Sequence, residues 1–436
     1  MRDRAAILAL ALVVAVLGGR FAVRTLQSAR HGDARDFAIL YTGAHLYRAG
    51  ASFYDPGMDR VDGVNRNVAL VAEARRLGTL HAHDDLVHVH AFSYPPFALL
   101  AFLPFSALDW RHAVAAWLLI SAGLLVLAFL CIVRAARLSA VAALSVAAIF
   151  LVSESLENSM GLGQINQLVL ALLALFVWAL ASGRAGLAGA ALGVATALRV
   201  HPALFIGWLA WRAKWRAFSV ACLTAVSCTA LAVVAVGWPA TVEYVTRVAP
   251  QYGYATVPGQ LGNLSLPGWL VATGHGLWPE APLGAWRTLG MLSAAALLAA
   301  AVWVLRPAGS IAPARLVPEL ALLTLVLLLI TPNTTINHLV FTLLPIVVLV
   351  DATLGDGSPA RAAWLALALV LIGAIDDYYQ HPSLASGPAV LLAGIKTYGL
   401  ATLVALVLTT LPRPASAAVP ATAGAATVAP VQAGRQ

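Results

Sequence analysis

The sequence predicts an all-α, polytopic membrane protein, and two observations carry that prediction. Hydrophobic residues make up 61% of the 436 residues and charged residues only 11%, which is too little charge to cover a soluble chain of this length. Long apolar runs also recur along the whole chain, and an α-helix needs about 20 such residues to cross a bilayer. We therefore expect one membrane-embedded domain over residues 1–410, with about twelve transmembrane helices.

The first apolar run, residues 5–19, follows Arg2 and Arg4. No clean small-x-small cleavage site comes after it, so we expect an uncleaved first span that ends near Val23, with Arg20 reaching the interface. The stretch 94–107 is apolar but short and broken by prolines, which favours a re-entrant or interfacial helix. The expected spans are 5–23, 112–133, 139–155, 165–182, 186–199, 202–212, 216–237, 286–305, 316–331, 338–352, 361–377 and 389–410.

Basic residues indicate how the chain is oriented. With a cytoplasmic N-terminus, the short inner loops hold basic residues such as Arg134, Arg212 and Arg361, as the positive-inside rule expects. Segment 24–93 is rich in arginine and would lie outside, but loops of this length cross largely regardless of charge. Segments 24–93 and 238–285 are thus expected to be folded extracytoplasmic loops, the first of them helical. Residues 411–436 are expected to form a disordered cytoplasmic tail.

Several functional classes are disfavoured by composition. No basic stripe is interleaved with exposed aromatics, so no nucleic-acid partner is expected. The three cysteines lie in apolar runs and form neither a disulfide framework nor a zinc motif. The histidine-rich run 81–90 could chelate a metal, but no second cluster completes a site, and a solvated loop is the expectation. No internal repeat and no matching pair of broken helices marks a transporter.

The first outer segment holds the carboxylate of greatest interest. Asp33 has the position of an N-cap for a helix that ends at Gly50, which places Asp36 at the third helical position. Asp36 could simply favour the helix dipole there. Alternatively, it faces a cleft at membrane level and accepts a proton from a hydroxyl nucleophile. Spacing alone leaves both interpretations open.

Polar residues beside apolar spans mark further candidates. Tyr94, before Pro95 and Pro96, begins a rigid turn at the interface. Acidic and amide residues next to spans are costly unless they line a polar cavity. Five of them cluster around two glycines: Glu154, Glu157, Asn158, Gln164 and Asn166.

Two basic side chains could meet a phosphate. Arg199 lies between two short apolar segments on the predicted outer side, where it needs a partner. A lipid phosphate suits a guanidinium, although an arginine that reaches the interface is an equal alternative. His338 opens a late span and could bind a phosphate or an acceptor, or could lie in interfacial water.

In chain order, these landmarks form a recurring set of motifs. Asp36 to Tyr41 leads to Gly50 and Tyr54-Asp55-Pro56, and Tyr94-Pro95-Pro96 comes next. Gly163-Gln164-Ile165-Asn166 follows, then the run from Gly193 to Arg199 and Pro202, the segment Trp211 to Trp215, Gly237-Trp238-Pro239, and Asn263-Leu264-Ser265-Leu266. Over residues 33–350 this order resembles glycosyltransferase family 87. Two departures concern specificity. The family often has Ser-Pro-x-x-Trp-x-His-His before a late span; here Thr335 stands at the Trp position and Asn337 at the first His, and only His338 is kept. Arg199 also stands where the family usually has a lysine.

The resemblance implies a membrane-embedded transferase of the C superfamily, with no cofactor and no metal. Its donor would be a sugar, mannose or another hexose, on a polyprenyl phosphate, and its acceptor a glycan or glycolipid. The reaction would invert the anomer at the outer side of the cytoplasmic membrane. Asp36 would be the catalytic base, and Arg199 and His338 would bind the donor phosphate. The substrate cleft would be lined by Tyr41, Tyr94, Gln164, Asn166 and Asn263.

Two other functions stay open at this point. A transporter or flippase of a lipid-linked saccharide would use a similar set of spans, although the long aromatic outer loops favour an enzyme. A catalytically inactive glycan-binding relative is also compatible with the altered Pro332–His338 segment.

Overall fold

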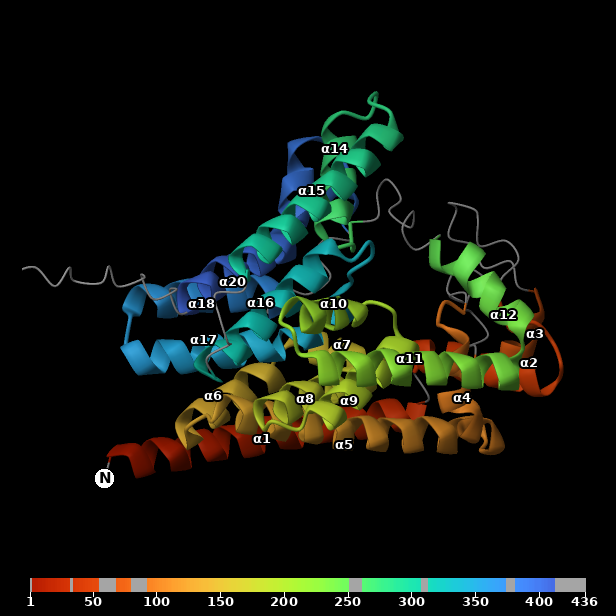
Figure 1. Cartoon of the computed structure of the whole chain (residues 1–436), viewed down its shortest axis with the longest axis horizontal. Coiled ribbons are helices and arrows are strands. Elements are labelled where there is room, and N and C mark those ends of the chain that lie inside the picture. The colour runs from red at the N-terminus through yellow and green to blue at the C-terminus, as the bar shows by residue number, and fades with distance from the viewer. Residues whose placement is uncertain are drawn as a thin grey trace, which may run out of the picture.

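The computed structural model describes residues 2–31, 34–54, 68–79, 92–250, 261–306, 313–373 and 381–411. All regular elements within these ranges are helical, as predicted (Figure 1). In chain order they are α1 (Arg2–His31), α2 (Arg35–Arg48), α3 (Val68–Arg76), α4 (Pro96–Phe102), η2 (Leu103–Ala107), α5 (Trp110–Ala136), α6 (Ala140–Leu151), α7 (Glu154–Gly161), α8 (Asn166–Ala181), α9 (Ala185–Leu198), α10 (Ala203–Trp211), α11 (Trp215–Val236), α12 (Trp238–Glu243), η3 (Tyr244–Val248), α14 (Leu266–Leu277), α15 (Leu283–Val304), α16 (Pro313–Ile330), η4 (Ile336–Thr342), α17 (Leu343–Asp356), α18 (Pro359–Gly373), η6 (Pro382–Leu384), η7 (Gly387–Ala389), α19 (Val390–Ala393) and α20 (Ile395–Thr410).

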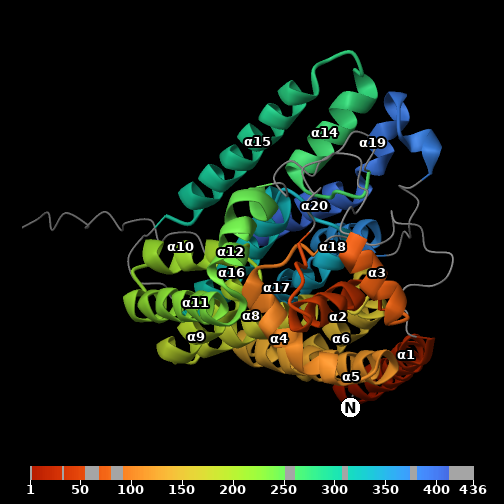
Figure 2. The ribbon, with the colours of Figure 1, turned by 90° about the vertical axis from the view of Figure 1, so that its right-hand side faces the viewer.

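The long helices pack side by side in two groups (Figures 1 and 2). One group contains α1, α5, α6, α8, α9 and α11, and the other contains α16, α17, α18 and α20. The groups meet where α17 packs against α5 and α6, and where α16 packs against α8. Helices α14 and α15 form a hairpin that rises from the rest of the bundle in both views. The buried faces of these helices form the main hydrophobic core.

Fewer helices of the described residues qualify as membrane spans by length and composition than the twelve that the sequence suggested. In the described part of the chain, five helices are long and apolar enough to cross a bilayer, or seven if each of two bent helix pairs counts as one span. Four further apolar helices are shorter, among them α8 with 16 residues and α9 with 14. The multi-pass architecture is therefore confirmed, but the count of about twelve is not.

Two spans are broken, which the sequence analysis did not anticipate. Helix α6 bends by 58° into α7, and the segment Gly387–Ala393 bends by 50° into α20. Neither break contains a proline; the first lies where the apolar run of α6 gives way to the polar sequence of α7, and the second lies within an apolar run. The first break occurs at Ser153 and the second at Gly394. A buried ion pair joins the two broken spans, because Lys396 Nζ donates to Glu154 Oε2 at 2.5 Å.

Small residues bring α9 and α11 into close contact. A Cβ atom at Gly189 would lie 2.4 Å from the carbonyl oxygen of Ala217, and one at Gly193 would lie 2.6 Å from that of Ala221. Glycine at these positions lets two membrane helices approach to backbone contact. The packing of α9 fixes the position of Arg199, which follows its last residue.

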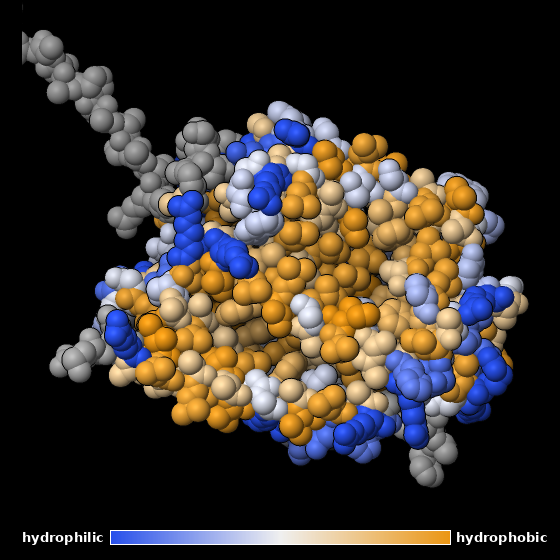
Figure 3. Space-filling view, turned by 90° about the horizontal axis from the view of Figure 1, so that it is seen from below, coloured by the Kyte–Doolittle hydropathy of each residue, from blue (hydrophilic) through white to orange (hydrophobic). Residues whose placement is uncertain are grey.

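One face of the molecule has the character of a lipid-facing surface. Helices α1 and α5 expose large apolar side chains there, including Leu8, Leu12, Leu119 and Val126. Figure 3 shows this face as mostly hydrophobic, with hydrophilic residues gathered toward its margins. A soluble monomer rarely exposes so large an apolar area.

The predicted first outer loop does contain helices, α2 and α3, but its start differs from the prediction. Helix α2 begins at Arg35 after Ala34, which provides no side-chain cap, so Asp36 is the second helical residue and not the third. Asp33 lies outside the described residues, as does residue range 412–436 of the predicted tail. The chain leaves α2 through Gly50, whose φ of +71° is the left-handed conformation that ends helices.

Arg20 also has a partner that was not foreseen. Its guanidinium forms an ion pair with Glu157 at 2.7 Å, and Arg24 pairs with the same carboxylate. Arg20 is thus held by α7 and does not merely reach the interface, and α1 continues past Val23 to His31.

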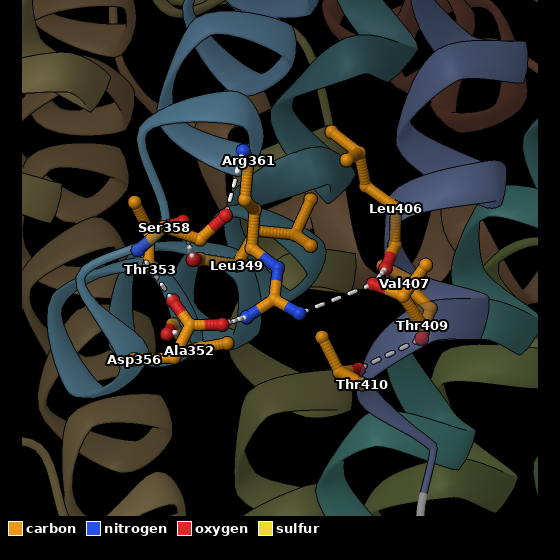
Figure 4. A network of polar contacts seen from close by, with 10 residues as sticks. All are labelled: Leu349, Ala352, Thr353, Asp356, Ser358, Arg361, Leu406, Val407, Thr409 and Thr410. Carbon is orange, nitrogen blue, oxygen red and sulfur yellow. Dashed lines mark hydrogen bonds and ion pairs between the residues drawn. The ribbon is translucent and has the colours of Figure 1, made fainter.

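The predicted inner arginines stabilise helix ends. Arg361, at the start of α18, pairs with Asp356 and donates to the carbonyl oxygen of Ala352 at 3.3 Å and to Thr409 Oγ1 at 3.5 Å (Figure 4). These bonds hold the α17–α18 turn against the end of α20. Arg212 pairs with Glu319 of α16, and both side chains are buried.

Candidate functional site

The first turn of α2 docks against the junction between α7 and α8. The backbone amides of Asp36 and Phe37 donate to the carbonyl oxygen of Leu162 at 3.0 and 3.3 Å. Gly163 adopts a φ of +64°, and a Cβ atom there would lie only 2.8 Å from Phe37 Cβ. Trp117 Nε1 donates to the Gly163 carbonyl at 2.8 Å. Glycine is therefore needed at this point for both the turn and the close approach of α2.

This docking brings Asp36 to Gln164. The Gln164 amide donates a hydrogen bond to Asp36 Oδ2. Gln164 is buried, whereas Asp36 is partly exposed. The carboxylate is thus oriented from one side by an amide and stays accessible from another, which is the arrangement that a base acting on a substrate hydroxyl requires.

Arg199 and His338 meet at a second point of the site. Arg199 Nη1 lies 2.6 Å from His338 Nε2, and the Arg199 guanidinium carbon lies 5.4 Å from the centre of the Tyr94 ring. Tyr94 is buried, and its carbonyl oxygen accepts a hydrogen bond from the Tyr54 hydroxyl at 3.0 Å. The structure therefore brings together three of the residues that the sequence analysis singled out.

Both ring nitrogens of His338 make polar contacts. The backbone amide of Thr335 lies 3.0 Å from Nδ1 and the Thr335 hydroxyl 3.1 Å from it. On the other side of the ring, Arg199 can only donate, so its hydrogen bond to Nε2 uses that nitrogen as the acceptor. The other N–H groups of the guanidinium can donate to an anion.

Asn166 connects the two points. Its Nδ2 donates to the carbonyl oxygen of Asn337, next to His338, at 2.8 Å. The four residues from Gly163 to Asn166 thus reach Asp36 at one end and the Arg199–His338 pair at the other. In the described part of the chain, the side-chain oxygens of Gln164, Asn166 and Asn337 are buried and accept no hydrogen bond. Buried acceptors of this kind are costly, so a bound group with hydroxyls would suit them.

Tyr41 and Asn263, which were predicted to line the substrate cleft, form hydrogen bonds with backbone groups of neighbouring segments. The Tyr41 hydroxyl donates to the Leu108 carbonyl at 2.7 Å, and burial raises the pKa of this hydroxyl. Asn263 Nδ2 donates to the Pro332 carbonyl at 2.7 Å, and its Oδ1 accepts from the Thr334 amide at 3.1 Å. Asn263 thereby connects its loop to the segment that leads to His338.

Other residues join the site without having been predicted. His201 is two residues after Arg199, and its ring centre lies 6.3 Å from that of His338. The motif position of His201 was visible in the sequence, but its proximity to His338 depends on the packing of two distant helices. The His45 ring packs against that of Tyr41 at a tilt of 58°, with ring centres 4.7 Å apart, and burial lowers the pKa of His45.

The described residues contain no group of three or more histidine, cysteine or acidic side chains that could hold a metal ion. The histidine-rich run 81–90 lies outside the described residues.

Comparisons with known proteins extend these observations. The α-(1→3)-arabinofuranosyltransferase of Corynebacterium glutamicum is 30% identical over 196 residues, which cover 43% of this chain and 45% of that relative. The chain therefore matches less than half the length of this relative. The crystal structure of ArnT from Cupriavidus metallidurans bound to undecaprenyl phosphate aligns with a TM-score of 0.45 and 14% identity, over 91% of this chain and 77% of that chain.

The family assignment rests on a longer match. The family model of glycosyltransferase family 87 matches residues 92–332, which is more than half of the chain. This range contains Tyr94, Gln164, Asn166, Arg199 and Asn263, whereas Asp36 and His338 lie outside it. The family that the ordered motifs suggested is confirmed: this multi-pass, all-helical membrane protein belongs to glycosyltransferase family 87.

Proposed function

We propose that this protein transfers a sugar from a polyprenyl-phosphate donor to a glycan or glycolipid acceptor, with inversion, at the extracytoplasmic face of the cytoplasmic membrane. One observation carries the proposal. A single short junction, Gly163 to Asn166, bonds to Asp36 through Gln164 and to the segment that bears His338 through Asn166. A carboxylate and a paired set of cationic or N–H donors are the two components that such a transfer needs.

The donor phosphate is assigned to Arg199 and His338. A guanidinium offers two parallel N–H groups to phosphate oxygens, and His338 lies beside it, with Nε2 2.6 Å from Arg199 Nη1. Tyr94 supports the guanidinium from its ring face at 5.4 Å. The negative charge that collects on the leaving phosphate would be stabilised by these donors, which are held in place before the reaction begins.

Asp36 is assigned to the acceptor. Its carboxylate takes the proton from the acceptor hydroxyl as that oxygen forms a bond to the anomeric carbon. On the opposite side, the bond from the anomeric carbon to the phosphate oxygen breaks, and its electron pair leaves with the polyprenyl phosphate. One such displacement inverts the anomer, so a β-linked donor gives an α-linked product.

The donor sugar is proposed to be mannose or another hexose, and arabinofuranose is tested beside it because a relative is named for that transfer. The buried amide oxygens of Gln164, Asn166 and Asn337 would accept hydrogen bonds from sugar hydroxyls. A lipid-linked donor suits their location among apolar helices, because the reacting carbon is tethered at the membrane surface and needs no nucleotide pocket.

The proposal is tested with the full chain in proteoliposomes. Radiolabelled polyprenyl-phosphate-mannose and polyprenyl-phosphate-arabinofuranose are supplied with alkyl glycosides as acceptors, and the anomer of the product is determined by NMR. We expect label in the acceptor with inverted configuration. Absence of transfer and of donor hydrolysis with either donor, together with movement of the intact donor lipid across the membrane, would instead support a flippase.

A further inference from the structure

A cavity separate from the Arg199–His338 pair opens between α1 and α7. Its volume is about 580 Å³, within the range of small-molecule sites. The residues that define its character are Phe21, Arg24, Gln27, Ser28, His31 and Glu157. Two basic side chains, one acidic side chain, an amide and two hydroxyls, those of Ser28 and Thr25, thus line the cavity together with the ring of Phe21.

The depth of this cavity follows from the length of α1. The apolar segment of α1 spans residues Arg4–His31, 28 residues. At about 1.5 Å per residue it is about 42 Å long, which exceeds a hydrocarbon layer of about 30 Å. The run without charges is residues 5–19, and Arg20, Arg24 and Arg30 follow it, so a bilayer that covers this run leaves residues 24–31 beyond the apolar layer at the end that leads to α2. The cavity therefore lies at the level of lipid headgroups.

The ion pairs at the mouth of the cavity keep its polar groups in place. Glu157 pairs with Arg20 at 2.7 Å and also with Arg24, yet its side chain remains 27% exposed and that of Arg24 53% exposed. A carboxylate held in this way can accept hydrogen bonds from neighbouring hydroxyls, and the arginine and Gln27 can donate them. Polar groups of this kind beside the aromatic ring of Phe21 suit a sugar ring.

The chain that lines the cavity continues to the segment that contacts the proposed catalytic carboxylate. Gly161 lines the cavity, and the next carbonyl, that of Leu162, accepts the amide of Asp36 at 3.0 Å. Gln164 then bonds to the Asp36 side chain, and Asn166 reaches toward His338. Along six residues the chain passes from the cavity to Asp36 and on to the proposed donor site.

We infer that this cavity binds the carbohydrate headgroup of the acceptor glycolipid. The inference rests on the proposed function and assigns a place to the acceptor that the family match does not give. The acceptor sugar would bond to Glu157, Gln27 and Ser28 while its lipid chains lie along the exposed apolar face of α1. A hydroxyl at its inner edge would then be presented to Asp36.

The test fills the cavity with a matched control on the same helix. Ser28→Trp inserts an indole into the cavity, whereas Leu26→Trp adds the same side chain at a position that is 59% exposed. The full chain in liposomes is photolabelled with an alkyl mannoside whose sugar carries a diazirine, and labelled peptides are mapped by mass spectrometry. We expect labelling of residues 21–31 and 157–161, competition by unlabelled alkyl mannoside, and at least a fivefold loss of labelling in Ser28→Trp only.

Transfer assays separate this inference from the proposed function. Ser28→Trp should retain hydrolysis of polyprenyl-phosphate-sugar while the KM for an alkyl glycoside acceptor rises at least tenfold. If the wild type neither transfers nor hydrolyses the donor, the proposed function fails. The photolabelling then still shows, independently of activity, whether the cavity binds the alkyl mannoside. Labelling outside the cavity, equal labelling of both tryptophan variants, or competition by phosphatidylglycerol but not by alkyl mannoside would overturn the inference.

Discussion

Gln164 donates a hydrogen bond to the carboxylate of Asp36, a residue 128 positions earlier in the chain. The bond connects the α7–α8 junction to the first turn of α2, and it orients the one acidic side chain that both the motif order and the geometry place in the site. The other end of the Gln164 amide, the side-chain oxygen, is buried and accepts no hydrogen bond within the described residues. Gln164 is therefore a positioning residue for Asp36.

Gln164→Ala should lower kcat for sugar transfer by about one to two orders of magnitude, because a hydrogen bond to a charged group is worth roughly 1.5–3 kcal/mol. The KM for the donor should change little, since the donor phosphate is bound elsewhere. The matched control is Gln167→Ala. It removes a buried amide of α8 that donates to Ser159 Oγ of α7 at 2.9 Å, next to the same junction. Equal losses of kcat in the two variants would indicate a purely structural role for Gln164.

Gly163→Ala should weaken the docking of α2. The new Cβ would meet Phe37 and Ala34, at 2.8 and 3.0 Å from their Cβ atoms, and the φ of +64° disfavours alanine. Gly183→Ala is the control, because its φ of +72° imposes the same backbone strain while no atom lies within 4 Å of its added Cβ. We expect both variants to lose roughly 1 kcal/mol of stability from strain. Only Gly163→Ala should also lose transfer activity.

Arg199→Gln should raise the KM for the lipid-linked donor and lower kcat/KM by one to two orders of magnitude, as loss of a charge-assisted bond to a desolvated phosphate requires. Arg199→Lys should restore part of the loss, because the charge returns without the bidentate geometry. The control is Arg184→Gln, which removes a guanidinium 4.8 Å from the Trp178 ring centre. Steady-state kinetics with varied donor measure these effects, and an unchanged donor KM in Arg199→Gln would contradict the phosphate assignment.

Breaking the Lys396–Glu154 pair should destabilise the protein more than removing both charges. Lys396 is fully buried and Glu154 nearly so, and an uncompensated buried charge costs roughly 3–5 kcal/mol. Thermal unfolding in detergent should therefore show large losses for Lys396→Met and for Glu154→Gln alone. The double variant should recover most of the loss. If each single variant unfolds like the wild type, the pair does not hold the two broken spans together.

The fold could be predicted from the sequence as far as apolar runs define it. Most expected spans have a helix near their bounds, such as α11 at Trp215–Val236 for the predicted 216–237. The breaks at Ser153 and Gly394 were not predicted: neither carries a proline, the first lies where an apolar run meets a polar segment, and the second lies within an apolar run. The count of about twelve spans was not confirmed, because several apolar runs fold as helices of 9 to 16 residues, shorter than the roughly 20 residues that cross a bilayer.

The site could be predicted only as a set of candidate residues. Arg199 and His338 stood out because charges next to apolar spans need partners, but their contact at 2.6 Å joins residues 139 positions apart. The second position of Asp36 in α2 also differed from the expected third, since helix starts depend on tertiary packing as well as on capping residues. Local patterns name such residues, whereas helix packing decides which of them meet.

The central claim is that Asp36 accepts the proton of the acceptor hydroxyl, and Asp36→Asn tests it most directly. Asparagine keeps the size and can still bond to Gln164, but it cannot take the proton. Asp109→Asn is the matched control, because Asp109 caps α5 through the amide of His112 and asparagine caps helices equally well. With labelled polyprenyl-phosphate-sugar in proteoliposomes, we expect kcat of Asp36→Asn to fall at least about 100-fold. The Asp109→Asn variant should remain as active as the wild type, and an Asp36→Asn variant with wild-type turnover would contradict the account.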